Sequence, residues 1–113
     1  KRQQFGKPIG GLEMIQAMLA DMAMKVESAR LMVYKALWLY GAGKDFSKES
    51  AMAKCYAGDM AMQVTTDAVQ IMGGYGYNKT GPVEKLMRDA KVMQIYEGTN
   101  QVQRLVIAGK LLK

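Results

Sequence analysis

The chain has 113 residues, half of them hydrophobic, a formal net charge of +6 and a sequence pI near 9.5. This length suits one domain with a modest core, and the hydrophobic content excludes a disordered chain. The basic balance suits an anionic ligand, such as a nucleotide or a phosphorylated thiol carrier, as well as it suits a merely solvated surface. Nucleic-acid binding is disfavoured, because the basic residues are scattered and no aromatic residues are interleaved with them.

No apolar run approaches the roughly 20 residues that a bilayer requires, so no membrane association is expected. The first residues, "KRQQFGKPIGG", lack the apolar core of a signal peptide. We therefore expect a cytosolic or organelle-matrix protein, cytoplasmic if bacterial and in the mitochondrial matrix if eukaryotic. The first residue is not Met, and we expect a fragment or a processed piece.

Two absences narrow the possible chemistry. The sequence has no His, which removes Ser-His-Asp and Cys-His catalysis and most transition-metal sites. The single Cys55 excludes an internal disulfide, and its small and apolar neighbours favour a buried structural thiol over a nucleophile. Proton chemistry near neutral pH would have to use a carboxylate, a Lys or a Tyr.

Apolar periodicity predicts two long helices, from Leu12 to about Leu39 and from about Ser47 to Met72. The apolar stripe of the first is Ile15, Leu19, Met22, Val26, Ala29, Val33, Leu37 and Tyr40. We expect Gly41 to cap its end, Trp38 to pack against a neighbouring element, and Asp45 or Ser47 to cap the second helix. The short connection predicts an antiparallel hairpin.

The sequence after Met72 predicts two shorter helices, and no part of the chain predicts a strand pair. "PVEKLMRDAK" begins with Pro82 in its first turn and Thr80 as its cap, and the last helix runs from Thr99 to the end. Residues 92–98, "VMQIYEG", form a non-helical link. The expected fold is all-α, an antiparallel up-and-down bundle in which the eleven methionines mostly fill the core rather than line a recognition groove.

The glycine-rich segment "GGYGYN" follows a helix, and it lacks the spacing of a dinucleotide fingerprint or a P-loop. Local sequence favours a helix C-terminal cap with a tight turn. The glycines would also let backbone amides approach a phosphate or a flavin edge.

Glu97 permits two interpretations from its neighbours alone. A lone Glu before a helix is often an ordinary acid facing the helix dipole. However, Gly98 permits a sharp bend, Thr99 can cap the following helix, and Ile95 and Tyr96 offer an apolar wall beside the carboxylate. A helix start with open amides next to a base could hold a polarised carbonyl beside the proton being removed.

Several blocks carry a resemblance to one family. "GYGYNKTGPVEKLMRDAKVMQIYEGT", "QIYEGTNQVQRLVIAG", "FGKPI" and "MLADMAMKVESAR" all resemble the C-terminal domain of the acyl-CoA dehydrogenases. The resemblance covers essentially the whole chain and is nearest to the medium- and short-chain straight-chain enzymes. It implies that residues 1–113 are most of a C-terminal four-helix bundle, without the N-terminal helical and middle β domains of the family.

The resemblance also implies a reaction. Family enzymes bind FAD and oxidise an acyl-CoA to the trans-2-enoyl-CoA in fatty-acid β-oxidation. Glu97 stands where the family has the catalytic base that removes the pro-R α-proton, and the β-hydrogen leaves as hydride to the flavin. Tyr96 and Gly98 would contact the substrate, and the backbone N–H of Glu97 would help to hold the thioester carbonyl.

The FAD contacts implied by the resemblance lie in three stretches. Arg2 would reach the pyrophosphate, with Gln4 and Phe5 beside it. Gln70, Gly73 and Gly74 would lie near the adenosine half of an FAD held by an adjacent subunit. Thr99 and Gln101 would make polar contacts just after the base.

Two functional hypotheses follow. In the first, the chain is the catalytic-base domain of a straight-chain acyl-CoA dehydrogenase, inactive alone, whose partners are acyl-CoA and an acceptor such as electron-transfer flavoprotein. In the second, the chain is a non-catalytic helical scaffold or oligomerisation module. Family enzymes are commonly homotetramers, and we expect a dimer or a larger oligomer for the fragment, because a bundle lacking one helix exposes an apolar stripe.

Overall fold

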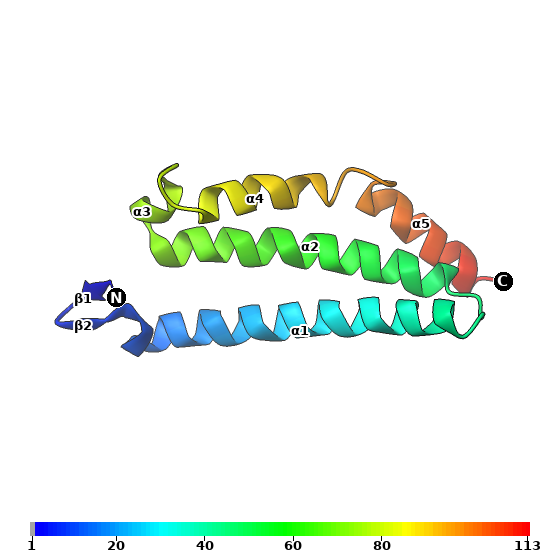
Figure 1. The fold of residues 1–113 in the computed structure, drawn as a ribbon, viewed down its shortest axis with the longest axis horizontal. Helices are drawn as coiled ribbons and strands as arrows, with labels where there is room; N and C mark the ends of the chain where they lie inside the picture. The colour runs from blue at the N-terminus through cyan, green and yellow to red at the C-terminus, as the bar shows by residue number, and fades with distance from the viewer. Residues whose placement is uncertain (1) are drawn as a thin grey trace.

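The computed structural model describes residues 2–113, which form an elongated, almost entirely helical domain (Figure 1). The helices are α1 (Glu13–Gly41), α2 (Ser47–Met72), α3 (Gly74–Tyr77), α4 (Val83–Val92) and α5 (Asn100–Leu111). The Cα radius of gyration is 17.3 Å, compared with about 13 Å for a compact chain of this length. The predicted all-α fold with two long helices is confirmed, although the short helix α3 was not predicted.

α2 is the central helix of the domain. It packs against α1 on one side and against α4 and α5 on the other, and α3 lies at its C-terminal end. α1 runs antiparallel to α2, and α4 and α5 lie end to end, both antiparallel to α2 (Figure 1). The arrangement is therefore up, down and up, and the third pass is divided between two short helices.

Small residues on α2 permit this close packing on both sides. Ala51, Ala53, Cys55 and Gly58 are the buried residues of α2. A Cβ added to Gly58 would lie 3.0 Å from the Met93 carbonyl oxygen and 3.1 Å from the Asn100 side-chain nitrogen. The link between α4 and α5 thus lies directly on the backbone of α2. Cys55 is the buried structural thiol that the sequence predicts.

The predicted stripe of α1 is only partly correct. Ile15, Met22 and Ala29 are half buried, but Leu19, Val26, Val33, Leu37 and Tyr40 are exposed. The face that packs against α2 instead includes Met18, Met32, Ala36 and Leu39. Both sets have helical spacing, so α1 is apolar on two faces and only one of them is covered by this chain.

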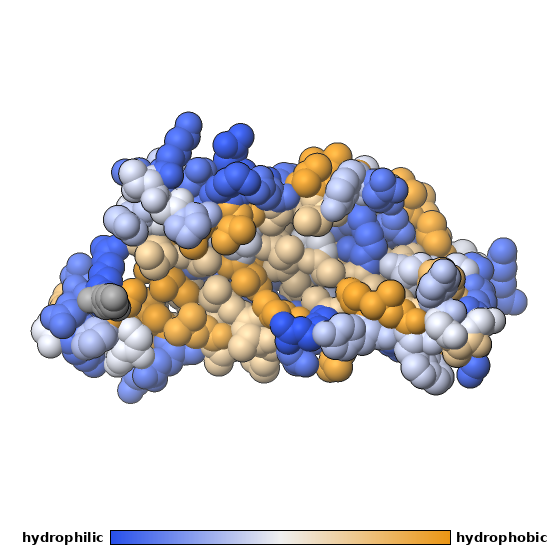
Figure 2. Space-filling model, viewed as in Figure 1, coloured by the Kyte–Doolittle hydropathy of each residue, from blue (hydrophilic) through white to orange (hydrophobic). Residues whose placement is uncertain are grey.

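The uncovered apolar surface is visible along the junction of α1 and α2 in Figure 2. Val33, Leu37, Tyr40, Phe46 and neighbouring α2 residues line an apolar groove of about 470 Å³ between these two helices. Trp38 is 63% exposed, so the expectation that it packs against another element is wrong within residues 2–113. Its described neighbour is the Lys44 ammonium, 5.1 Å from the ring centroid.

None of the described helices combines the length and the hydropathy needed to cross a membrane.

The helix boundaries correct several sequence expectations. α1 includes Gly41, and the left-handed residue after it is Gly43, with φ +67°. The N-cap of α2 is Phe46, although the Asp45 carboxylate accepts a hydrogen bond of 3.0 Å from the Ser47 N–H. The N-cap of α4 is Pro82 rather than Thr80, since the helix begins only at Val83.

A strand pair that the sequence analysis missed lies at the N-terminus. β1 (Gln3–Gln4) and β2 (Lys7–Pro8) are antiparallel, and the 3₁₀ turn η1 (Ile9–Gly11) leads into α1. Phe5 and Gly6 form the two-residue turn, with φ of +53° and +76°. Strands of two residues are too short to show alternation, and the Phe5-Gly6 pair is the only local signal for such a turn.

Candidate functional site

Glu97 lies at the interruption between α4 and α5, in the link Met93–Thr99, hereafter the Glu97 loop. The chain forms a tight turn directly after α4, where the N–H groups of Ile95 and Tyr96 both donate to the Val92 carbonyl, at 2.9 and 3.0 Å. The backbone then reverses at Glu97 and Gly98, which have φ of +54° and +83°. Left-handed backbone is disfavoured for a residue with a Cβ, so Glu97 must be held in this conformation by its surroundings.

The loop ends in a capped helix start. Thr99 is the N-cap of α5, and its hydroxyl accepts a hydrogen bond of 3.3 Å from the Val102 N–H. The Asn100 N–H donates back across the loop to the Gln94 carbonyl at 3.0 Å. The predicted cap is confirmed. Gln101 follows on the exposed side of α5.

The Glu97 side chain is presented to solvent. It is exposed, and its carboxylate makes no hydrogen bond or ion pair to any of residues 2–113. Ile95 is 54% exposed and Tyr96 is 46% exposed. The Tyr96 hydroxyl contacts the Met93 sulfur at 2.9 Å, so the ring turns back along the chain. Within the described residues, the expected apolar wall beside the carboxylate is therefore only partly formed, because about half of each of these two side chains is exposed.

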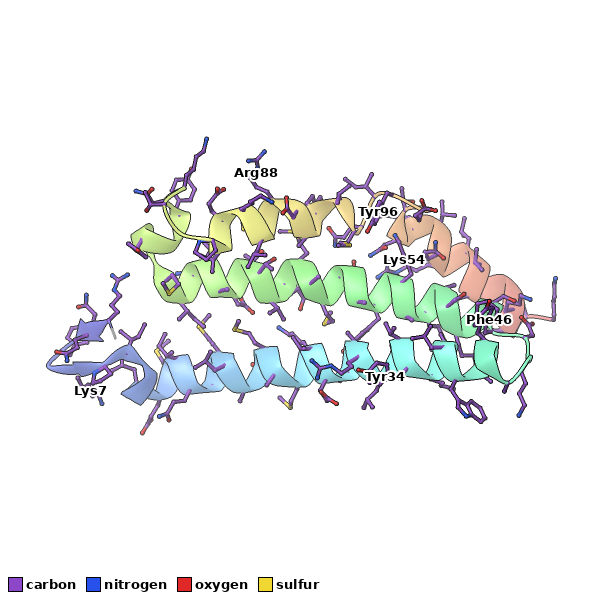
Figure 3. All side chains as sticks on the ribbon, in the orientation of Figure 1. Lys7, Tyr34, Phe46, Lys54, Arg88 and Tyr96 are labelled. Carbon is purple, nitrogen blue, oxygen red and sulfur yellow. The ribbon has the colours of Figure 1, made fainter. Side chains whose placement is uncertain are left out.

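The residues that hold the loop were not identified from the sequence. Asn100 is 2% exposed, and its side-chain amide donates to the Cys55 carbonyl at 3.0 Å and to the Asp59 carboxylate at 2.8 Å. Its side-chain oxygen accepts a hydrogen bond of 2.7 Å from the Lys54 ammonium. Figure 3 shows Lys54 reaching from α2 toward the loop, beside Tyr96. The sequence did offer one signal for them, because Lys54 and Asp59 are charged residues within a stretch of mostly small and apolar residues on a long helix.

Asp59 is the point where this polar network converges. Gln94 donates to it at 2.9 Å, Asn100 at 2.8 Å and Arg104 at 2.7 Å. Burial alone would raise the pKa of the Asp59 carboxyl, but hydrogen bonds from Arg104, Asn100 and Gln94 outweigh it and lower the pKa below its usual value. Asp59 is therefore ionised near neutral pH and ties the loop and α5 to α2.

A second group of predicted residues gathers at the opposite end of α2. The residues Arg2, Gln4, Phe5, Gln70, Gly73 and Gly74 are hereafter the Arg2 cluster. The Arg2 guanidinium donates to the Met72 carbonyl at 2.5 Å, and a Cβ on Gly73 would lie 3.3 Å from it. Gly73 has φ +62° and is the C-cap of α2, as expected. The following turn, α3, was not predicted.

Two grooves lie beside the residues of the Arg2 cluster. Arg2, Gly74 and Tyr75 line one groove of about 600 Å³, and Phe5, Gln70 and the acidic Glu13 line another of about 620 Å³. Phe5 is 90% exposed in a left-handed turn position that is unusual for an aromatic residue. Gln4 is exposed on β1. The guanidinium offers donors to a phosphate and Phe5 offers a stacking surface, whereas the Gly73 N–H already donates to the Gln70 carbonyl at 3.1 Å.

The structure does not bring the two groups together. Lys54, which contacts the Glu97 loop, and Gln70, in the Arg2 cluster, are sixteen residues apart on one straight helix, which corresponds to about 24 Å. Two separate half-sites thus lie on one chain. One presents a carboxylate and the other presents a cation with glycines.

Comparison with known proteins agrees with the all-helical fold. Residues 1–112 match the family "Acyl-CoA dehydrogenase, C-terminal domain". The chain is 52% identical over its whole length to cyclohexane-1-carbonyl-CoA dehydrogenase from Geobacter metallireducens, of which it covers 30%. Butyryl-CoA dehydrogenase from Megasphaera elsdenii superposes with a TM-score of 0.98 and 54% identity, over all of this chain and 30% of that one.

A chain in a structure of the electron transferring flavoprotein of Acidaminococcus fermentans superposes equally well. The TM-score is 0.98 and the identity 56%, over 99% of this chain and 30% of that chain. This chain belongs to the acyl-CoA dehydrogenase family and corresponds to its C-terminal domain. It spans about 30% of the length of these relatives.

Proposed function

We propose that this chain is the domain that supplies the catalytic base, Glu97, to an FAD-dependent acyl-CoA dehydrogenase. The supporting observation is the interruption between α4 and α5, which presents an exposed carboxylate on a bent backbone. The proposed reaction converts a straight-chain acyl-CoA to the trans-2-enoyl-CoA in fatty-acid β-oxidation. The isolated domain is expected to be inactive, because the flavin and acyl pockets need the rest of the protein.

Glu97 would remove the pro-R α-proton of the thioester, and its carboxylate has no competing partner among residues 2–113. The backbone N–H of Glu97 donates no hydrogen bond within the described residues. This N–H can therefore hold the thioester carbonyl and stabilise the enolate that develops as the proton leaves. Gly98 and Tyr96 would lie against the substrate on either side of the base.

FAD, when bound, supplies the hydride acceptor for the β-hydrogen. Two sets of residues would contact it. Thr99 and Gln101 lie beside the base and would contact the flavin portion. The Arg2 cluster has a guanidinium that can pair with a pyrophosphate and a glycine turn beside it, and we propose that it contacts the adenosine diphosphate portion.

The separation of about 24 Å between the two half-sites supports a homo-oligomer, a tetramer in the intact protein. In this arrangement the Arg2 cluster would serve an FAD held by an adjacent subunit, while Glu97 serves another. The uncovered apolar face of α1 is consistent with burial against further protein. The relatives are named for butyryl-CoA and cyclohexane-1-carbonyl-CoA, and we propose that residues outside this chain select the acyl group.

An electron-transfer flavoprotein is the proposed acceptor, because one of the superposed structures is of such a protein. The proposed compartment is the cytoplasm of a bacterium or the matrix of a mitochondrion. The second hypothesis, a non-catalytic scaffold, draws on the same exposed apolar face of α1. It leaves the left-handed backbone and exposed carboxylate of Glu97 without a role.

The test uses the full-length protein. A saturated acyl-CoA, added without oxygen, should bleach the yellow flavin of the wild-type protein. Glu97→Gln should retain its flavin and should not bleach. Glu84→Gln, on α4, is the matched control and should bleach at the wild-type rate. A Glu97→Gln protein that bleaches normally would refute the assignment, and a full-length protein without flavin would favour the scaffold.

A further inference from the structure

The backbone of the Glu97 loop has two adjacent left-handed residues, Glu97 with φ +54° and Gly98 with φ +83°. Glycine adopts this conformation freely, but a residue with a Cβ does so only when its neighbours enforce it. The direction of the Glu97 side chain follows from this backbone conformation. The groups that enforce it therefore determine where the carboxylate points.

Two side chains from different helices hold the carbonyl groups of these residues. The Lys54 ammonium, from α2, donates to the Gly98 carbonyl at 2.7 Å. The Gln103 amide, from α5, donates to the Glu97 carbonyl at 2.9 Å and lies 3.4 Å from the Gly98 carbonyl. A rotation of the Glu97 or Gly98 backbone out of the left-handed region would break at least one of these bonds.

Lys54 is itself fixed in place. Its ammonium also donates to the Asn100 side-chain oxygen at 2.7 Å, and Asn100 is anchored to the Cys55 carbonyl and to Asp59. The charged hydrogen bond to Gly98 is stronger than a neutral one. Gln103 is half buried and lies four residues beyond the helix cap Thr99. Both donors thus project from helices, α2 and α5, that pack against each other.

We propose that Lys54 and Gln103 are positioning residues for the base, a role that rests on the proposed function of Glu97. They contact neither the carboxylate nor, in the proposed arrangement, the substrate. They act by holding the two carbonyls that fix the Glu97 backbone. Loss of either donor should leave the binding surface in place and should misdirect the carboxylate relative to the α-proton.

The test compares full-length, flavin-loaded variants. Lys54→Met removes the ammonium and keeps most of the aliphatic stem, and Gln103→Leu removes the amide donor. Each should lower kcat about tenfold or more, with KM for a saturated acyl-CoA within about twofold and flavin content unchanged. Lys48→Met, which removes a lysine from the same helix, should leave kcat unchanged. Lys54→Arg restores a donor and should recover part of the lost rate.

An isotope effect separates positioning from a general structural role. With α-deuterated acyl-CoA, the primary effect on kcat should increase in Lys54→Met and Gln103→Leu, because proton removal becomes more rate-limiting. If Lys54→Met does not fold or loses its flavin, Gln103→Leu decides alone. Wild-type kcat and isotope effect in Gln103→Leu, or in both variants, would overturn the inference. Glu97→Gln is assayed in parallel: if it retains turnover, the proposed function itself fails.

Discussion

The two half-sites of this domain are held in different ways. The Glu97 loop is fixed by hydrogen bonds from two helices, with the buried Asn100 at the centre. Among residues 2–113, the Arg2 cluster is joined across the chain by one side-chain hydrogen bond, from Arg2 to the Met72 carbonyl. Proton removal depends on small distances, so a base benefits from a rigid mount. An extended anionic ligand can instead complete a surface that is partly formed in one chain.

The strongest test of this difference is the removal of Asn100. Asn100→Ala removes the buried side-chain hydrogen bonds to the Cys55 carbonyl and to Asp59 and leaves the Lys54 ammonium with the Gly98 carbonyl alone, at a cost of about 2–3 kcal/mol. We expect a clear fall in the Tm of the full-length protein, together with a loss of turnover. Gln101→Ala, one residue further on the exposed face, is the control and should change stability by less than about 0.5 kcal/mol. Equal Tm values for the two variants would show that the Glu97 loop is not held as described.

Glycine substitutions test the close contact between α2 and the Glu97 loop. Gly58→Ala places a Cβ 3.0 Å from the Met93 carbonyl oxygen and 3.1 Å from the Asn100 amide nitrogen. We expect about 1–2 kcal/mol of destabilisation and slower turnover, because the loop must shift. Gly109→Ala, in α5, meets no atom within 4 Å and should be neutral or stabilising by up to about 1 kcal/mol. A Gly58→Ala protein as stable and active as Gly109→Ala would contradict the packing.

The Arg2 cluster should respond in cofactor affinity rather than in turnover. Arg2→Ala removes the cation proposed for the pyrophosphate, and we expect FAD affinity to fall about tenfold or more, as for the loss of a charged hydrogen bond. With FAD in excess, kcat should be close to that of the wild type. Lys35→Ala, which removes an exposed cation from α1, serves as the control. A fall in kcat at saturating FAD would show that the two half-sites are not independent.

The smallest expected effect concerns pH. Hydrogen bonds lower the folded pKa of Asp59 below its unfolded value of about 3.9. The carboxylate therefore stabilises the fold above that pH, and the contribution is lost as pH falls through the folded pKa. The Tm difference between the wild type and Asp59→Asn should be constant from about pH 7 to pH 5 and should narrow below about pH 4. A difference that does not change with pH would exclude an ionised Asp59 from the network.

Much of the fold could be predicted from the sequence. The two long helices, the Thr99 cap and the non-helical Glu97 loop follow from periodicity and capping patterns. The buried face of α1 could not be chosen, because Leu19, Val26 and Val33 form an apolar stripe as regular as the one that packs against α2. The strand pair escaped prediction because four paired residues carry no periodic signal.

The candidate site also has a part that could be predicted from the sequence and a part that could not. Glu97 and its glycine neighbour are adjacent in sequence, and their pattern could be read directly. Lys54, Asp59 and Gln103 hold that loop through contacts between residues far apart in the chain or a helical turn away, and each looks like an ordinary helix residue by itself. The positive φ of Glu97 also depends on these contacts, so it could not be predicted from the local sequence.

The most direct test of the account is exchange of the substrate α-proton. A flavin-loaded full-length protein is incubated in D₂O with an acyl-CoA whose β-carbon cannot release hydride, and deuterium at the α-carbon is followed by NMR. The wild type should incorporate deuterium, and Glu97→Gln should be slower by about 10²–10⁴-fold while binding the ligand equally well. Exchange at the wild-type rate in Glu97→Gln would contradict the assignment of Glu97 as the base.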